Sequence, residues 1–178
     1  MDALVAWIAN RLGLRWGAPP ASDTATVVPK AAAAVIKQKG AANDFDVFLS
    51  YRSPDRTAVV KIGEALKAQG ILPWLDVWEL RPGQPWQEEL ERQIGNIKSV
   101  VVFFGNEPLA RWQKEEVRIF VSEFVDRNCA VIPVVLPDAK SDPEIPRFLR
   151  GFQAIDFRKK EPDPVKQLIW GITGERPA

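Results

Sequence analysis

Histidine is absent from this chain of 178 residues, and cysteine occurs once, at Cys129. The lack of histidine excludes catalytic triads of the Ser-His-Asp type, Cys-His nucleophiles and metal sites with histidine ligands. A single cysteine excludes an intrachain disulfide and fits a reducing compartment. No apolar run approaches the roughly 20 residues that a membrane-spanning helix needs. We therefore expect a cytoplasmic protein without a membrane segment and without a metal centre.

An excess of one charge is also lacking, since 24 Lys and Arg residues stand against 23 Asp and Glu residues. These totals give no sign of a basic surface for nucleic acid or for an anionic membrane. Hydrophobic residues make up 46 % of the chain, which is enough for a sizeable core. The length allows one ordinary domain with an additional segment.

Residues 1–42 differ in composition from the rest of the chain. An apolar stripe at helical spacing runs from Leu4 to Trp16 and ends in a Gly-Ala-Pro-Pro sequence. A signal peptide is the alternative, but no Lys or Arg precedes the apolar residues, and Asp2 stands where the positive region would be. We expect a short amphipathic helix for docking or oligomerisation, then a linker and a second helical segment over 30–39.

From residue 43 onward, apolar runs alternate with helical patterns. The run from Phe45 to Ser50 indicates a buried strand, and the helical period after it ends at Gly70, a residue type that commonly ends helices. Strands alternating with helices form parallel sheets with both faces covered, so the pattern predicts an α/β fold. The other expected strands are 71–75, 99–104, 129–135 and 152–156, and the expected helices are 55–69, 86–94, 110–126, 145–150 and 164–172.

Residues 43–175 are thus expected to form a flavodoxin-like domain with five parallel strands in the order 2-1-3-4-5. Pro73 in the second strand agrees with an edge position, because proline cannot donate a sheet hydrogen bond. Residues 76–85, with two prolines and a glycine, are expected to form a loop. Strands one and three flank the switch point of this order, so a ligand should contact the turns that follow them, Ser50 to Arg52 and 105–116.

Two residues in the second of these turns carry candidate chemistry. Trp112 and Glu116 are four residues apart, so they share one face of the predicted helix. That face borders the expected core stripe, which places Glu116 beside the core at the ligand-binding end of the sheet. Glu115 points further toward solvent and is the weaker candidate. The alternative is a surface ion pair next to a half-buried tryptophan, with no chemistry.

Three segments together resemble the TIR domain in order and spacing, over about residues 43–175. The Trp-x-x-x-Glu pair is similar to that of enzymatic TIR domains, bacterial ones included, in which the glutamate is the catalytic residue of NAD⁺ cleavage. The three segments are Asp46 to Arg52, which is similar to box 1; Leu80 to Gly83, inside a loop similar to the BB loop; and Trp112 to Glu116.

The resemblance implies an NAD⁺ glycohydrolase that releases nicotinamide and forms ADP-ribose or a cyclised isomer, with NAD⁺ as substrate and no separate cofactor. It implies that Glu116 is the catalytic residue. The sequence departs from the family pattern at Ser53, where a second basic residue often stands, and at Arg81, where some members have an acidic residue. The residues implied to bind NAD⁺ are Tyr51, Arg52, Ser53, Leu80, Arg81 and Trp112.

This chemistry is compatible with a chain that has no histidine. Cleavage of NAD⁺ expels neutral nicotinamide, so the leaving group needs no general acid. Positive charge develops on the ribose, and a fixed carboxylate can stabilise or trap it, as in glycosidases. Arg52 and nearby backbone N–H groups could hold the pyrophosphate.

The resemblance further implies self-association, because the active site of TIR enzymes is completed by a neighbouring protomer that meets the BB loop. Trp78, Pro82 and Gly83 are the expected assembly residues of this loop. A large aromatic residue on a long loop favours an interface over solvent. A role in prokaryotic immune (antiphage) defence or signalling is also expected, with an upstream sensor domain or a partner protein.

A non-catalytic TIR scaffold that mediates protein interaction is the alternative function. A phosphoacceptor receiver of this architecture needs an aspartate at the end of strand three, where this chain has Phe104 and Gly105. A flavin site needs a hydroxyl- and glycine-rich loop after strand one, which residues 51–54 do not supply. A deoxyribosyl-transferring enzyme, which also uses a glutamate, is a more distant alternative.

Overall fold

The computed structural model describes residues 28–79, 93–107 and 111–176, without the side chains of residues 76, 77, 111–113 and 116. The helix expected near the N-terminus and most of the helix expected over 86–94 lie outside the described residues, although residues 93–96 are helical. No helix of the described part has the length and apolar composition that crossing a bilayer requires.

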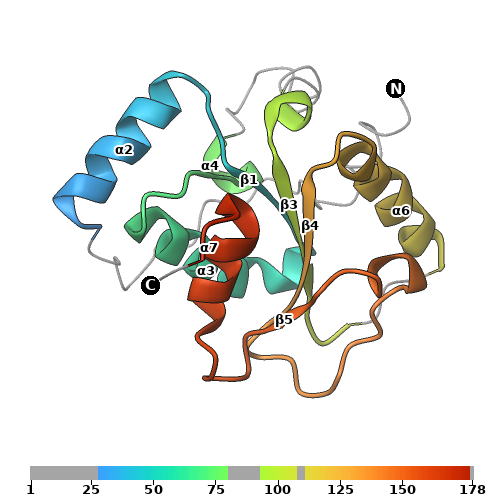
Figure 1. Cartoon of the computed structure of the whole chain (residues 1–178). Helices are drawn as coiled ribbons and strands as arrows, with labels where there is room; N and C mark the ends of the chain where they lie inside the picture. The colour runs from blue at the N-terminus through green and yellow to red at the C-terminus, as the bar shows by residue number, and fades with distance from the viewer. Residues whose placement is uncertain (1–27, 80–92, 108–110, 177–178) are drawn as a thin grey trace.

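A five-stranded sheet forms the centre of the molecule, in the order β2-β1-β3-β4-β5 (Figure 1). All of its pairings are parallel, and Phe48 of the first strand stands opposite Trp74 on one side and Val100 on the other. The predicted fold class and strand order are confirmed, including the edge position of the strand that contains Pro73. The strands are β1 (Val47–Ser50), β2 (Pro73–Trp74), β3 (Ser99–Phe104), β4 (Ala130–Val135) and β5 (Ile155–Asp156).

Helices cover both faces of this sheet (Figure 1). Helix α6 (Arg111–Asp126) lies on one face, and helices α3 (Arg56–Ala68) and α7 (Pro164–Thr173) lie on the other. Helix α2 (Lys30–Ala41) packs against α3 at the outside of the molecule. The shorter elements are the helix α4 (Asp76–Glu79) and the 3₁₀ turns η1 (Ser53–Asp55) and η2 (Arg147–Leu149).

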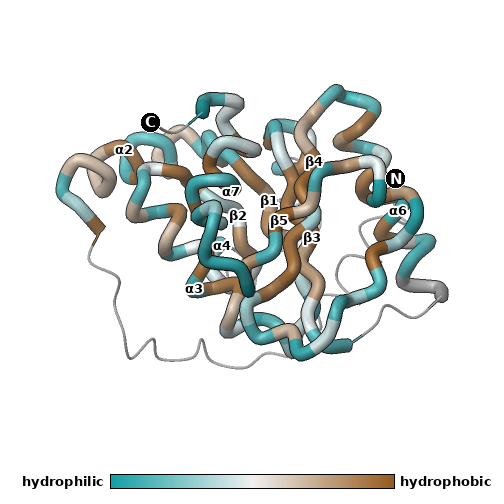
Figure 2. The backbone as a smooth tube through the Cα atoms, turned by 60° about the horizontal axis from the view of Figure 1, so that its bottom comes forward, coloured by the Kyte–Doolittle hydropathy of each residue, from teal (hydrophilic) through white to brown (hydrophobic). Residues whose placement is uncertain are grey.

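The apolar side chains of β3 explain why both faces are covered. Every residue of this strand is buried. Val100, Val102 and Phe104 belong to the core cluster under α6, and Val101 and Phe103 belong to the cluster under α3 and α7. Figure 2 shows the strands as the hydrophobic centre of the chain. The core stripe expected on α6 is also buried, and it consists of Val117, Phe120, Val121 and Phe124.

The end of α3 follows from one glycine. Gly70 has a φ of +79°, and the N–H groups of Gly70 and Ile71 bond to the carbonyls of Lys67 and Leu66. These two bonds form a Schellman motif, which satisfies carbonyls that the helix leaves without partners. The start of α7 is fixed differently, because the carboxylate of Asp163 accepts hydrogen bonds from N–H groups of the first turn.

The prediction of a loop over 76–85 is wrong for the first four residues, because they form the helix α4. The prolines and the glycine that favour a loop stand at 82–85, so they do not restrict the residues before them. Trp78 packs its ring on α3, where a Cβ added at Gly63 would lie 2.8 Å from it. Lys67 Nζ lies 3.3 Å from the centroid of the same ring. These contacts are tertiary, and local sequence does not reveal them.

Four other elements are clearly shorter than expected. The strand predicted over 45–50 begins only at Val47, as β1, and the strands predicted over 71–75 and 152–156 are two residues long, as β2 and β5. The helix predicted over 145–150 contains only the 3₁₀ turn η2. Strand β3 has the predicted bounds, because its apolar run is the longest and has no internal proline.

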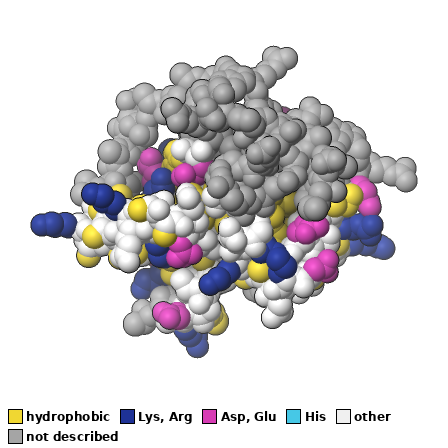
Figure 3. All heavy atoms as spheres, turned by 90° about the horizontal axis from the view of Figure 1, so that it is seen from above, with side chains coloured by type: hydrophobic (Ala, Val, Ile, Leu, Met, Phe, Trp, Pro, Cys, Tyr) yellow, Lys and Arg dark blue, Asp and Glu magenta, His cyan; other side chains and the backbone are white. Residues whose placement is uncertain are grey.

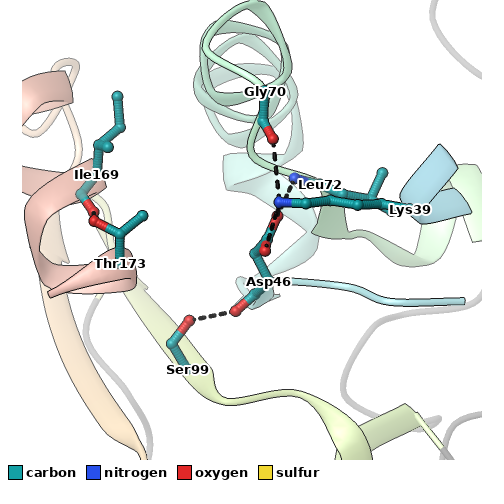
Figure 4. A network of polar contacts seen from close by, with 7 residues as sticks. All are labelled: Lys39, Asp46, Gly70, Leu72, Ser99, Ile169 and Thr173. Atoms are coloured by element: carbon teal, nitrogen blue, oxygen red, sulfur yellow. Dashed lines mark hydrogen bonds and ion pairs between the residues drawn. The ribbon is translucent and has the colours of Figure 1, made fainter. Parts of the chain in front are cut away.

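At the amino end of the sheet, Asp46 is the centre of a polar network (Figure 4). Its carboxylate accepts from Lys39 Nζ at 2.8 and 2.7 Å and from the Leu72 N–H at 2.6 Å, and its carbonyl accepts from Ser99 Oγ at 2.7 Å. Lys39 Nζ also donates to the Gly70 carbonyl at 3.3 Å. The network joins α2 to the starts of β1 and β3 and to the connection that leads into β2.

Candidate functional site

The loops that follow β1 and β3 meet at the carboxyl end of the sheet. Arg52 comes shortly after β1, and its guanidinium reaches Glu107 in the loop after β3. Arg52 Nη2 donates to Glu107 Oε2 at 2.9 Å, and Nη1 donates to the main-chain oxygen of Glu107 at 2.8 Å. The Arg52 side chain is 19 % exposed and the Glu107 side chain 63 % exposed. The arginine is therefore fixed at two points, while the carboxylate that it binds lies largely in solvent.

Asp55 is a second acidic residue in this region. Its carboxylate lies against Gly105, where an added Cβ would be 2.7 Å from Asp55 Cγ. Burial raises the pKa of the Asp55 carboxyl; the charge of Arg52 opposes this rise, and the charges of Asp138 and Glu107 add to it. A side chain at position 105 would displace Asp55, so the glycine after β3 permits the close approach of the two loops.

Asn106 connects the loop after β3 to the loop after β4. Its Nδ2 donates to the Asp138 carbonyl at 3.1 Å, and its Oδ1 accepts from the Lys140 N–H at 2.8 Å. Both polar ends of the amide are therefore used, which fixes the position of the β3 loop. Glu107 is the next residue, so these bonds help to hold it within reach of Arg52.

The charges of this region are mixed. Glu107 and Asp138 are close enough to Asp55 to raise its pKa, and Arg52 is the cation that opposes them. Among the described residues, no group of three or more His, Cys, Asp or Glu side chains could hold a metal ion. Figure 3 shows the opposite end of the sheet, where the described basic and acidic side chains are interspersed as well. The described geometry offers an anion one arginine, which already holds a carboxylate.

Tyr51 and Ser53 flank Arg52 in opposite environments. Tyr51 is 3 % exposed and belongs to the core cluster between the sheet and the helices α3 and α7. Ser53 is exposed and begins the 3₁₀ turn η1. The structure thus brings Arg52 to the site and packs the ring of Tyr51 into the core. Contact of either flanking residue with NAD⁺ stays a prediction.

The helix predicted to carry Trp112 and Glu116 is present. Helix α6 begins at Arg111 and includes both positions, so the four-residue spacing falls within one helix. Their side chains lie outside those that the structure describes, and the roles of Glu116 in catalysis and Trp112 in binding stay predictions. Glu115 is exposed, as expected, and its Oε1 accepts from Arg118 Nη2 at 2.8 Å.

The assembly residues are described only in part. Trp78 is half-buried, and it packs within its own chain against Gly63 and Lys67. Burial lowers the pKa of Lys67 and raises the pKa of the neighbouring Glu79. The remaining loop residues, Leu80, Arg81, Pro82 and Gly83, lie outside the described residues. The interface role of Trp78 and of this loop stays a prediction.

Sequence reasoning did not single out Glu107, Asp55 or Asn106. A signal for Glu107 was present, because it is the first acidic residue after β3 and thus a natural counter-ion for an arginine that follows β1. Asp55 had no such signal, since its environment is made by Gly105 from a distant part of the chain. Asn106 holds main-chain groups that a sequence pattern does not specify.

Comparisons with known proteins give a family match and similar solved structures. The family model described as “TIR domain” matches residues 47–169, which include Arg52, Glu107 and both α6 positions. The TIR domain of the Toll-related receptor TRR-2 from Hydra magnipapillata has a similar fold, with a TM-score of 0.54 and 22 % identity over 72 % of this chain and 98 % of that chain. The TIR domains of the activated Roq1 resistosome, which directly recognises the pathogen effector XopQ, match with 32 % identity over 51 % of this chain and 57 % of that chain, at a TM-score of 0.44.

Proposed function

This chain belongs to the TIR domain family, and from that premise we propose that it is an NAD⁺ glycohydrolase. The bond between nicotinamide and ribose breaks, and nicotinamide leaves with the electron pair of that bond. When water attacks the ribose, the products are nicotinamide, ADP-ribose and a proton. When the adenine of the same molecule attacks, the products are nicotinamide, a proton and a cyclic ADP-ribose isomer, which contains one water fewer than ADP-ribose.

The meeting of two loops at one end of the sheet is the observation that carries this proposal. The contact between Arg52 and Glu107 shows that the loop after β1 lies against the loop that leads into α6, the helix of Trp112 and Glu116. These loops flank the switch point between β1 and β3, where open α/β sheets bind their ligands. Arg52, the proposed cation for the pyrophosphate, therefore lies beside the loop that leads into the helix of Glu116, the proposed carboxylate for the ribose.

Glu116 acts in this reaction as an ionised carboxylate. Its negative charge stabilises the oxocarbenium-like ribose as nicotinamide departs, or forms a bond with it. No general acid is required, since the leaving group is neutral, and this agrees with a chain that has no histidine. The guanidinium of Arg52 binds the pyrophosphate and thereby orients the ribose toward the glutamate.

Self-association and a defence or signalling role in the cytoplasm complete the proposal. TIR domains commonly self-associate, and the loop that contains Pro82 and Gly83 is the proposed contact. A neighbouring protomer that meets this loop would complete the active site, so the protein would be inactive when dilute.

Replacement of one carboxylate by its amide tests the catalytic assignment. We expect Glu116→Gln to fold normally and to lose nicotinamide release by about 10²–10³-fold, the usual loss for one electrostatic contact to a transition state. Glu115→Gln is the matched control, because it makes the same change one residue away on an exposed position. Near-normal turnover by a folded Glu116→Gln protein would exclude the assignment.

A non-catalytic scaffold is the second candidate, and one observation favours it. The cation that should bind the pyrophosphate is occupied by Glu107, as expected in a domain with no nucleotide ligand. Nicotinamide release, measured across protein concentrations with and without a crowding agent, separates the two functions. A scaffold would associate under these conditions without releasing nicotinamide.

A further inference from the structure

The arginine expected to hold the pyrophosphate already holds an anion that belongs to the protein. Arg52 makes a two-point contact with Glu107, through the carboxylate at 2.9 Å and the main-chain oxygen at 2.8 Å. We propose that the Glu107 carboxylate competes with the substrate for Arg52, so that a nucleoside diphosphate binds fully only after the carboxylate has left. Because the proposed function assigns the pyrophosphate to Arg52, the inference rests on that function.

A ligand could replace one of the two hydrogen bonds between Arg52 and Glu107 more easily than the other. The main-chain oxygen of Glu107 belongs to a loop that Asn106 holds through two hydrogen bonds, so it keeps Nη1 of Arg52 in place. The carboxylate stands at the end of a side chain that is 63 % exposed and can rotate into solvent. Departure of the carboxylate therefore breaks the bond to Nη2, while the bond from Nη1 to the main chain keeps the guanidinium oriented.

The surrounding charges make the competition effective. Arg52, Asp138 and Glu107 are close enough to Asp55 to act on its pKa, so the region contains other acidic groups besides Glu107. A diphosphate that enters while the Glu107 carboxylate is bound to the arginine would meet one more negative charge than after this carboxylate has rotated into solvent. A guanidinium binds carboxylate and phosphate with the same paired N–H groups, so the two anions exclude each other at this position.

A purely structural ion pair is the competing explanation. In that case Glu107 would only fasten the loop after β3, and its removal would weaken folding and ligand binding together. Exposed pairs contribute little to stability, so the two explanations differ mainly in the sign of the effect on affinity. Competition predicts tighter binding without the carboxylate, whereas a fastening role predicts weaker or unchanged binding.

Calorimetric titration of the full chain with ADP tests the proposal, with adenosine as a ligand that has no phosphates. We expect Glu107→Gln to bind ADP about two- to fivefold more tightly than the unaltered protein, a range typical of one exposed ion pair. Adenosine affinity should not change. Glu115→Gln, which removes the same charge from the Arg118 pair on α6, should leave ADP affinity as it was. Thermal unfolding confirms that each variant is folded.

The same substitution made in an Arg52→Ala protein completes a double-mutant cycle for the Arg52–Glu107 pair. There the Glu107→Gln substitution should have no effect on ADP affinity, because the shared partner is absent. Equal ADP affinity of Glu107→Gln and the unaltered protein, tightening that persists without Arg52, or no ADP binding by any variant would each overturn the proposal. Tighter ADP binding by Glu107→Gln in a protein that releases no nicotinamide would support the competition and contradict NAD⁺ cleavage, so the two failures can be told apart.

Discussion

The two ends of the sheet use charged residues in different ways. At the amino end, the carboxylate of Asp46 accepts hydrogen bonds from Lys39 and from the Leu72 N–H, and these bonds hold parts of the fold together. At the carboxyl end, Arg52 holds an exposed carboxylate, and burial raises the pKa of Asp55.

This difference separates stability from function within one fold. A partly buried carboxylate with several donors is a stabilising feature, because loss of its bonds would leave donors unsatisfied. An arginine that holds a solvent-exposed carboxylate retains a partner that a ligand can replace. The amino end is therefore expected to set the stability of the domain, and the carboxyl end its binding and chemistry.

The largest expected effect is that of protein concentration on the reaction rate, which shows whether one chain contains the whole active site at the carboxyl end of the sheet. For a site shared by two protomers, mass action makes the rate rise with close to the square of protein concentration below the dissociation constant, or roughly 100-fold for a tenfold rise. Nicotinamide release measured over a dilution series, with light scattering for the assembly state, checks this. A rate strictly proportional to the concentration of a monomer would contradict the shared site.

Gly83→Pro is the variant that accompanies this series. Proline fixes φ and glycine permits conformations that other residues avoid, so the substitution should alter the loop's shape. We expect association and activity to fall together. Loss of activity with unchanged association would show that the loop acts on the substrate rather than on the neighbouring protomer.

Arg52→Ala sharpens the comparison at the carboxyl end. It removes a charged hydrogen-bond donor from the proposed pyrophosphate position, and such bonds contribute about 1.5–3 kcal/mol, so KM for NAD⁺ should rise by roughly tenfold or more. The free energy of unfolding should change by about 1 kcal/mol or less. Steady-state kinetics and denaturant unfolding give the two values. Arg118→Ala, on the exposed Glu115 pair, is the control and should change neither.

For Asp46→Ala at the amino end we expect the opposite result, a change in the free energy of unfolding without a change in KM. Removal of the carboxylate leaves Lys39 and the Leu72 N–H without their acceptor, which should lower the free energy of unfolding by about 1–3 kcal/mol. KM should stay the same in the folded protein. Asp44→Ala, an exposed position two residues earlier, is the control in urea unfolding. A stable Asp46→Ala protein with altered KM would reverse the assignment of the two ends.

The smallest effect is the pH dependence contributed by Asp55. Burial raises its pKa above the usual 3.8, so the folded state binds the proton more readily than the unfolded state. Its contribution to stability is therefore present below the unfolded pKa and lost as the pH rises through the folded pKa. Asp55→Asn should unfold at a higher temperature than the unaltered protein at pH 7, and the difference should shrink toward pH 4. A lower unfolding temperature at pH 7 would show that the ionised carboxylate is favourable there.

The layout of the sheet could be predicted because it depends on local signals. The apolar run of β3, the proline in β2 and the glycine after α3 each restrict the backbone where they stand. The alternation of five strands with helices predicted the strand order, the proline agreed with it, and the order predicted the end of the sheet at which a ligand should bind. Arg52 could be placed at that end for the same reason.

The features that could not be predicted depend on residues distant in sequence. Helix α4 forms next to a segment rich in breakers, and its Trp78 packs on Gly63 of α3. The partnership of Arg52 with Glu107 and the approach of Asp55 to Gly105 appear only when β1 and β3 lie side by side. A local pattern identifies which end of the sheet is used, but the contacts between its loops are set by tertiary packing.

The most direct measurement is the fate of NAD⁺ itself. The purified full chain is incubated with NAD⁺ at several protein concentrations, and the products are separated by chromatography. NAD⁺ cleavage predicts nicotinamide in an amount equal to ADP-ribose and cyclic ADP-ribose products together, with a yield that rises as protein concentration increases. NAD⁺ that remains intact at every protein concentration, in a sample shown to be folded and associated, would contradict it.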